Sequence, residues 1–301
     1  MRSGALDRVP APALFIASGL TQYVGAAIAV GLFATVAAPT VAWLRIVVAA
    51  VVLVLWRRPW RTRWDRRDLL AAALFGAVLA AMNVAFYVAI DHLPLGTAVA
   101  IEFIGPVAVA AVTGRGWRER AGIALAAAGV VLLAGVTVQQ HDGGGGGPDV
   151  VVGLIAIGVS ALCWAGYILL GRRIAVRGSG VSSLSLAMVA GAVVFAPFLA
   201  RDAVPVLADW RLALAVIGVG VLSSAVPYAI DQVVLRRIGA AAFAVLLALL
   251  PATAAVVGAV ALRQWPHGLE VVGLLAVSGA IVLTSGRSAP ASRAPEPVTP
   301  G

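Results

Sequence analysis

The sequence predicts an all-α membrane protein with ten transmembrane helices in two inverted five-helix repeats. The first observation behind this prediction is composition. Hydrophobic residues make up 61% of the chain and charged residues 12%, whereas a soluble domain averages about 45–50% apolar and about 25% charged residues. In water, that surplus would leave large apolar patches exposed. The other two observations are the lengths of the apolar runs and the placement of the arginines.

The apolar runs are long enough to cross a bilayer as helices. About 20 residues at a rise of about 1.5 Å cross the hydrocarbon layer with every backbone amide bonded inside the helix. The expected spans are 13–32, 39–56, 68–90, 97–113, 121–138, 150–170, 183–200, 211–235, 240–262 and 268–285. The first run follows two arginines, and we expect it to be retained as a span rather than removed as a signal peptide.

The arginines give these spans an orientation. All 22 basic residues are arginines, and they gather in alternate connections. With both termini in the cytoplasm, 18 of them are cytoplasmic, three (Arg201, Arg211 and Arg263) are outside, and Arg45 lies within a span. This asymmetry follows the positive-inside rule and predicts a multi-pass protein of the bacterial cytoplasmic membrane. The net charge of +9 does not predict a nucleic-acid partner, because a basic groove needs a soluble domain to present it.

A glycine-rich segment divides the chain into two groups of five spans. Residues 139–149 contain five glycines and a proline, which is typical of a flexible extracytoplasmic linker. We therefore expect repeats at 1–138 and 150–286. Because each group has an odd number of spans, the second enters the membrane from the opposite side, and the repeat is inverted. Residues 287–301 are rich in Pro, Ala and Ser and are expected to form a disordered cytoplasmic tail.

Sliding the sequence along itself tests the repeat. A shift of 145 positions superposes Pro106 on Pro251 and Asn83 on Tyr228. Each proline removes a hydrogen bond near the middle of its helix, and paired helix breaks often mark the binding site of a repeat-built transporter. Proline kinks are also common packing features of membrane helices.

Two ionisable residues, Arg45 and Glu102, fall well inside the expected spans. A charge in hydrocarbon is costly unless it meets a partner or a water-filled cavity. The functional interpretation makes Glu102 a proton-titrating or ammonium-binding group, and makes Arg45 the receptor for a carboxylate. The alternative is a structural ion pair, or an arginine that extends outward to the membrane surface.

Polar side chains also recur on one helix face. Asn83 and Tyr87 are four residues apart and share a face, and the repeat places Tyr228 and Gln232 at the equivalent positions. This pattern favours a shared lining around a substrate, although interhelical hydrogen bonds between amide and hydroxyl groups are equally typical of membrane bundles.

The sequence gives little support to enzymatic chemistry, cofactors or metals. The lone Cys163 cannot form an internal disulfide. His92, His141 and His267 lie in or beside loops without a metal-binding pair. The sequence contains no phosphate-binding loop for ATP, so a carrier driven by a gradient is expected rather than a primary pump, with no cofactor.

Three segments resemble a known family. The motif LPLGTAVAIEFIGP occupies 93–106, SAVPYAID occupies 224–231, and VAWLR ends at Arg45. Together they are similar to the EamA family of the drug/metabolite transporter superfamily, in particular to its threonine/homoserine exporter branch. The resemblance runs from about residue 12 to residue 285.

The resemblance implies ten helices in two inverted repeats around a central cavity, and export of amino acids or related metabolites coupled to protons. It places Arg45, Asn83, Tyr87, Glu102 and Tyr228 near that cavity. Two features depart from the family pattern: Leu250 stands where a glutamate often precedes the second-half proline, and Arg263 with Gln264 replaces a Gly-Glu pair. These departures put the substrate and the coupling in doubt, while leaving the fold intact.

The leading hypothesis is therefore a secondary exporter of a small polar metabolite, an amino acid such as threonine or homoserine, by alternating access. A carrier of drugs or other metabolites is one alternative. Another, from a different class, is a scaffold or enzyme subunit without a transport cycle. The expected partners are a small-molecule substrate and the bilayer, and the sequence is compatible with a homodimer.

Overall fold

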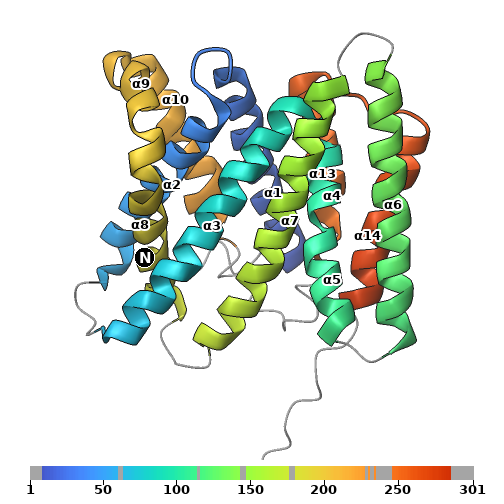
Figure 1. The fold of residues 1–301 in the computed structure, drawn as a ribbon, viewed down its shortest axis with the longest axis horizontal. Helices are drawn as coiled ribbons and strands as arrows, with labels where there is room; N and C mark the ends of the chain where they lie inside the picture. The colour runs from blue at the N-terminus through green and yellow to red at the C-terminus, as the bar shows by residue number, and fades with distance from the viewer. Residues whose placement is uncertain are drawn as a thin grey trace, which may run out of the picture.

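Every regular element that the structure describes is a helix (Figure 1). The structure, a computed structural model, describes residues 9–59, 64–113, 116–142, 147–175, 180–227, 230, 234 and 246–285. Tyr228, Gln232 and the expected tail at 287–301 lie outside the described residues.

The helices of the first half follow the predicted spans closely. They are α1 (Ala11–Leu32), α2 (Ala38–Arg57), α3 (Arg66–His92), α4 (Leu95–Glu102), α5 (Ile104–Thr113) and α6 (Trp117–Asp142). The helices α1 and α2 begin with a proline in the first turn, where its missing N–H costs no helical hydrogen bond. The carboxylate of Asp65 accepts the Asp68 N–H at 2.6 Å and caps α3.

The second half contains more irregular elements. It comprises α7 (Gly147–Ala175), α8 (Gly180–Leu199), the 3₁₀ turn η3 (Arg201–Ala203), α9 (Val204–Ala208), α10 (Trp210–Gly220), the π-helical segment η4 (Val221–Ala225), α13 (Leu249–Leu262) and α14 (Leu269–Ser285). The segment Arg201–Ala208 bends by 88° from the end of α8. The sequence analysis anticipated neither this bend nor the change from α10 to the π-helical η4.

The lengths and surfaces of these helices are those of a membrane protein. Within the described ranges, six helices are long and apolar enough to cross a bilayer, or seven if α8 and the bent segment after it form one span. Three shorter apolar helices follow at Trp210–Ala225, Leu249–Leu262 and Leu269–Thr284. Large side chains such as Leu70, Val112 and Leu162 are exposed, which suits a lipid-facing surface. The protein is therefore an all-helical, multi-pass membrane protein.

Two helix breaks lie one turn before prolines. The interruption at Phe103 separates α4 from α5 and precedes Pro106, while the turn at Leu247 and Ala248 precedes Pro251 at the start of α13. A proline offers no N–H to the carbonyl four residues earlier and its ring crowds that carbonyl. The break in each case follows from this missing hydrogen bond.

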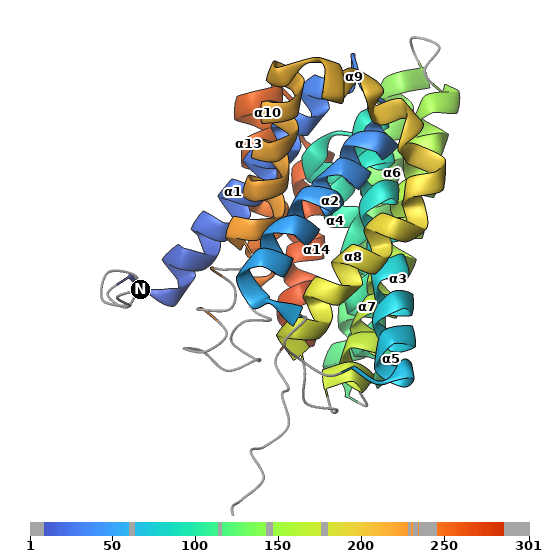
Figure 2. The ribbon, with the colours of Figure 1, turned by 90° about the vertical axis from the view of Figure 1, so that its left-hand side faces the viewer.

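Helices of the two halves interleave and touch at glycines. The contacts pair α3 with α7 and α8, α6 with α14, and α1 with α13, and Figure 2 shows α1, α10 and α13 side by side. A Cβ atom added at Gly76 of α3 would overlap the backbone of Ala187 in α8, and one at Gly105 of α5 would overlap the Ala161 carbonyl in α7. Small residues allow this close approach of membrane helices.

Candidate functional site

Arg45 of α2 points into the bundle and binds the second half of the chain. Its Nε donates to Ser224 Oγ at 3.0 Å, and an Nη donates to the Ser223 carbonyl oxygen at 2.9 Å. On its other side, the guanidinium carbon lies 5.4 Å from the centre of the Tyr87 ring, a cation–π distance. The alternative in which Arg45 extends outward to the membrane surface is therefore wrong for this structure.

The shape of η4 explains why Ser223 can accept from Arg45. The next donor in an α-helix would come from position 227, but Pro227 has no N–H. The Ser223 carbonyl oxygen therefore lacks the usual donor four residues later, and it accepts from Arg45 in a π-helical turn of the kind often found at functional sites. Ser223 Oγ in turn donates to the Gln22 carbonyl of α1 at 3.1 Å, which holds the turn in place.

Tyr87 combines an aromatic wall with an unpaired hydroxyl. The side chain is fully buried, and its ring lies 6.0 and 6.1 Å, between centroids, from the rings of Phe33 and Phe86. In the described part of the chain, its Oη and the buried Thr40 Oγ1 have no hydrogen-bond partner. A buried polar group without a partner costs about 1–3 kcal/mol. A polar solute reaching Tyr87 Oη would remove that cost.

The position of the Glu102 side chain depends on the break between α4 and α5. Glu102 is the last residue of α4, and the break after it follows from Pro106. Phe103 in the break packs edge-on against Trp164 of α7, with 4.7 Å between ring centroids. The close approach of Gly105 to Ala161 brings α5 against the same helix. These contacts aim Glu102, which is 8% exposed, at α7.

The partner of Glu102 is Ser160 of α7. Ser160 Oγ lies 2.5 Å from Glu102 Oε1 and 3.0 Å from the Met82 carbonyl oxygen. A hydroxyl has one proton to donate, so it can serve both protonation states of the acid. It donates to the ionised carboxylate, or it accepts from the protonated acid and donates to Met82. The arrangement can hold a proton at Glu102 without leaving a buried group unsatisfied.

The two ionisable groups act on one another without forming a direct ion pair. The positive charge of Arg45 interacts electrostatically with the Glu102 carboxylate. Cys163 of α7 also lies close enough to Glu102 to interact with its carboxylate. In the part of the chain that the structure describes, Arg45 bonds to the 223–224 turn and Glu102 to Ser160 rather than to each other. The alternative of a structural ion pair is therefore not observed.

The structure brings together part of the predicted site. Arg45 meets Tyr87, and Glu102 lies within electrostatic range of Arg45. Asn83 is buried on the same helix as Tyr87, but its amide donates to the Leu79 carbonyl of its own helix at 2.7 Å. Tyr228 lies outside the described residues.

Sequence reasoning missed three partners: Ser160, Ser223 and Ser224. Serines are common in membrane helices, so a serine in the sequence does not by itself indicate a functional residue. For the Ser223 carbonyl a signal did exist, since Pro227, like Pro106 and Pro251, has no N–H for the carbonyl oxygen four residues earlier.

The departures from the family pattern have structural consequences at the end of α13. Arg263 adopts a left-handed backbone with φ of 59°, a conformation that glycine occupies without strain. Gln264 Oε1 accepts the Leu95 N–H at 2.9 Å and so caps α4. Leu250 is partly buried and packs beside Gly19 of α1. A search of the described residues for His, Cys, Asp and Glu clusters that could bind a metal ion finds none.

Comparison with known proteins identifies transporters. The model of the EamA-like transporter family matches residues 151–286. The threonine/homoserine exporter RhtA of Salmonella typhimurium (strain SL1344) is 33% identical over 272 residues, which are 90% of this chain and 90% of that protein. The threonine/homoserine exporter RhtA of Escherichia coli (strain K12) is 34% identical over 261 residues, covering 87% of this chain and 85% of that protein.

Proposed function

The chain belongs to the EamA-like transporter family, and from that premise we propose that it is a proton-coupled secondary exporter of a small zwitterionic metabolite, an amino acid such as threonine or homoserine. The family resemblance carried by the sequence motifs is confirmed, and the family is one of transporters rather than enzymes. The substrate, the coupling ion and the direction are the proposed parts.

The proposed architecture is ten spans in two inverted repeats, at 1–138 and 150–286, with a linker at 139–149 and both termini in the cytoplasm of a bacterium. The six long helices, the bent segment and the three shorter apolar helices supply these spans. The family model matches 151–286, almost the range of the second proposed repeat.

The contacts between helices support the proposed repeat. If the two halves are equivalent, exchanging each helix with its counterpart in the other half should turn one observed contact into another. The exchange equates α1 with α7, α2 with α8, α3 with α10–η4, α4–α5 with α13, and α6 with α14. Under it, the contacts of α3 with α7 and with α8 become those of η4 with α1 and with α2, and these also occur. The contact of α1 with α13 likewise becomes that of α7 with α5. Pairs that map onto themselves, such as α6 with α14, are present too.

Substrate recognition would use groups of opposite charge. Arg45 offers a guanidinium to a carboxylate, with the unpaired Tyr87 hydroxyl beside it, and Glu102 offers a carboxylate to an ammonium group. Asn83 and Tyr228 would complete the lining, and the breaks at Pro106 and Pro251 would let the helices bend as the site opens alternately to each side. The single observation that carries the proposal is the convergence of Arg45, Tyr87 and Glu102 within the bundle.

Proton coupling would act through Glu102 and Ser160. Because Ser160 can satisfy both the ionised and the protonated acid, the protein can take up a proton on one side and release it on the other. Binding of the substrate ammonium favours the ionised form, so substrate and proton would compete for Glu102.

The test is efflux from proteoliposomes loaded with radiolabelled L-threonine, with and without a pH gradient. Wild-type protein should release threonine faster when the gradient drives protons inward, and Glu102→Gln should abolish that dependence and weaken substrate binding by about 2–5 kcal/mol. Glu119→Gln is a matched control, because Glu119 is a carboxylate of similar burial, 7% exposed, in the first turn of α6. Gradient-dependent efflux by Glu102→Gln would remove Glu102 from the mechanism.

The same assay separates the alternatives. The aromatic groups around Tyr87 suit an apolar drug as well as an amino acid. Efflux of a hydrophobic cationic dye with no threonine efflux would favour a drug carrier. Cysteines introduced at Asn83 and Thr40 should change accessibility when substrate is added, whereas a scaffold would keep them fixed.

A further inference from the structure

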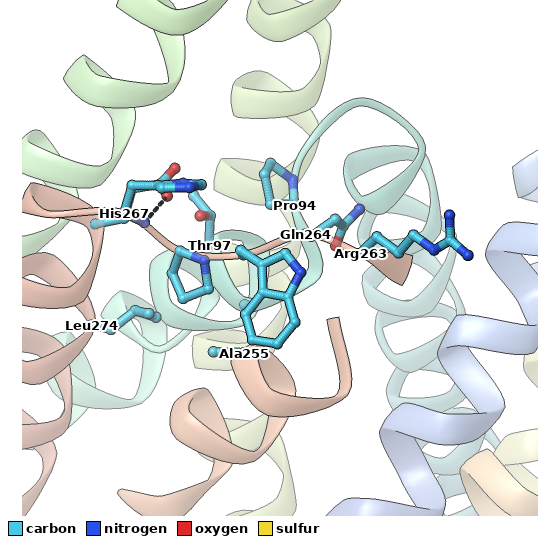
Figure 3. Close-up of a pocket in the computed structure, with 11 residues that line it drawn as sticks. Pro94, Thr97, Ala255, Arg263, Gln264, His267 and Leu274 are labelled. Carbon is cyan, nitrogen blue, oxygen red and sulfur yellow. Dashed lines mark hydrogen bonds between the residues drawn. The ribbon is translucent and has the colours of Figure 1, made fainter. Parts of the chain in front are cut away.

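A pocket that neither Arg45 nor Glu102 lines lies between the start of α4 and the connection from α13 to α14. It has a volume of about 230 Å³ and is lined by residues of both halves, among them Gly96, Thr97, Gln264, His267 and Glu270. Figure 3 shows Thr97 of α4 near His267, and Pro94, just before α4, near Gln264. In the proposed orientation, this pocket opens to the extracytoplasmic side.

One wall of the pocket suits a carboxylate. The first N–H groups of a helix have no acceptor within the helix and attract anions. At the start of α4, the Leu95 N–H is taken by Gln264, which leaves the N–H groups of Gly96 and Thr97 in the first turn. Gly96 packs directly on Ala255 of α13, and a Cβ atom there would lie 2.8 Å from the Ala255 Cα atom. The helix start is thus fixed against the second half.

The opposite wall suits an ammonium group. Glu270 is 5% exposed, and one of its carboxylate oxygens accepts the His267 N–H at 3.0 Å (Figure 3). This bond caps α14 and leaves the second oxygen for another donor. Thr97, which is 4% exposed, also lines the pocket. A hydroxyl at a pocket wall can donate a hydrogen bond to a polar ligand.

We propose that this pocket is a second binding site for a small zwitterionic amino acid, at the outer face of the transporter. The α4 N-terminus and Thr97 bind the carboxylate, and Glu270 binds the ammonium group. The volume favours a small solute, because pockets for drug-sized ligands hold about 300–1,000 Å³. The binding claim is independent of transport. Its role, as the last stop before release or as a sensor of external substrate, rests on the proposed function.

The experiment is calorimetric titration of L-threonine into the purified full-length Glu102→Gln protein in lipid nanodiscs, in which the central site is impaired. We expect binding to persist in this protein and to weaken at least about tenfold when Glu270→Gln is added. Glutamine keeps the side-chain oxygen that accepts the His267 N–H, so the cap of α14 should remain. N-acetyl-L-threonine, which lacks the ammonium group, and L-threonine amide, which lacks the carboxylate, should also bind at least about tenfold more weakly.

Two results would overturn the inference: Glu102→Gln protein that does not bind L-threonine, or Glu270→Gln that binds as tightly as its parent. Adding Glu119→Gln to the same parent is the matched control, and it should leave the titration unchanged. The outcomes are distinct from those of the efflux test. Wild-type protein that binds threonine at Glu270 but does not transport it would refute the proposed function and leave the second site standing.

Discussion

The two halves of the chain differ in what they contribute to the proposed central site. The first half supplies the charged groups, Arg45 and Glu102, together with the aromatic Tyr87. The second half supplies neutral partners, namely the hydroxyls of Ser160 and Ser224 and the carbonyl of Ser223. In the part of the chain that the structure describes, each side-chain hydrogen bond of Arg45 and Glu102 therefore crosses from one half to the other, so a relative movement of the halves would change the partners of both charges.

The two proline breaks show the same contrast on a smaller scale. Pro106 and Pro251 each interrupt a helix one turn earlier. The interruption leaves Glu102 at the first break and Leu247 at the second. The backbone break therefore follows from the proline. Whether an ionisable group lies at the break depends on the residue four positions before the proline. The following predictions test this contrast, from the largest expected effect to the smallest.

The contact between the halves should be most sensitive at Gly76. In Gly76→Ala, the new Cβ atom would overlap backbone atoms of Ala187, and backbone cannot rotate away as a side chain can. We expect a loss of about 3 kcal/mol or more, since α3 and α8 must separate. Thermal unfolding in detergent measures this loss. Gly31→Ala is the control, because nothing lies within 4 Å of its added Cβ, and equal stability of the two variants would contradict the proposed role of the interface.

The break in the first half should matter more for transport than the break in the second. Pro106→Ala restores an N–H for the Glu102 carbonyl, so α4 can continue into α5 and turn Glu102 away from Ser160. We expect threonine efflux to fall by about tenfold to a hundredfold, since a small misplacement of a reacting group has effects of this size. Pro251→Ala should have a clearly smaller effect, because no ionisable side chain stands at its break. Equal losses would mean that bending, rather than placement of Glu102, is what transport requires.

The contact of Arg45 with η4 should require a guanidinium rather than a charge alone. Lysine cannot donate to Ser224 Oγ and the Ser223 carbonyl in the same geometry. We expect Arg45→Lys to lose about 1.5–3 kcal/mol of substrate affinity, the contribution of a hydrogen bond to a charged group, measured as KM in proteoliposomes. Ser224→Ala removes one acceptor of the second half and should cost about 1 kcal/mol. If Arg45→Lys has a normal KM, the contact with η4 is not part of recognition.

The smallest expected effect is a change in stability from substitutions at the C-terminal ends of α2 and α13. Arg58 and Arg263 both adopt left-handed backbone, with φ of 49° and 59°, which costs a non-glycine residue about 1 kcal/mol. Arg263→Gly should therefore raise the unfolding temperature by up to about 4 °C without changing efflux, and Arg58→Gly should behave alike. A fall in stability at Arg263 alone would show that its side chain has a structural contact that outweighs the strain.

Much of the fold could be predicted because each element depends on local rules. Apolar runs of sufficient length predicted α1, α2 and α3 to within two residues at each end. The sequence analysis did not predict the 88° bend after α8 or the π-helical η4. Both depend on how neighbouring helices compete for backbone hydrogen bonds, which no local pattern records.

The candidate site was predictable only on its charged side. Arg45 and Glu102 stand out because an ionisable residue inside a span is rare and costly. Ser160 and Ser224 do not, since hydroxyls are common in membrane helices. Their importance comes from meeting Glu102 and Arg45 across 58 and 179 positions of sequence.

The amino-acid sequence by itself determined the membrane class, the helices, the family and the two groups too costly to leave in lipid, because solvation and backbone hydrogen bonding act on each segment separately. Only the tertiary structure decided which neutral groups those charges meet, and that Gln264, Thr97 and Glu270 enclose a second pocket. The physical reason is that a hydrogen bond between helices depends on their relative placement to within a fraction of an ångström. That placement follows from packing of the whole bundle rather than from any one segment.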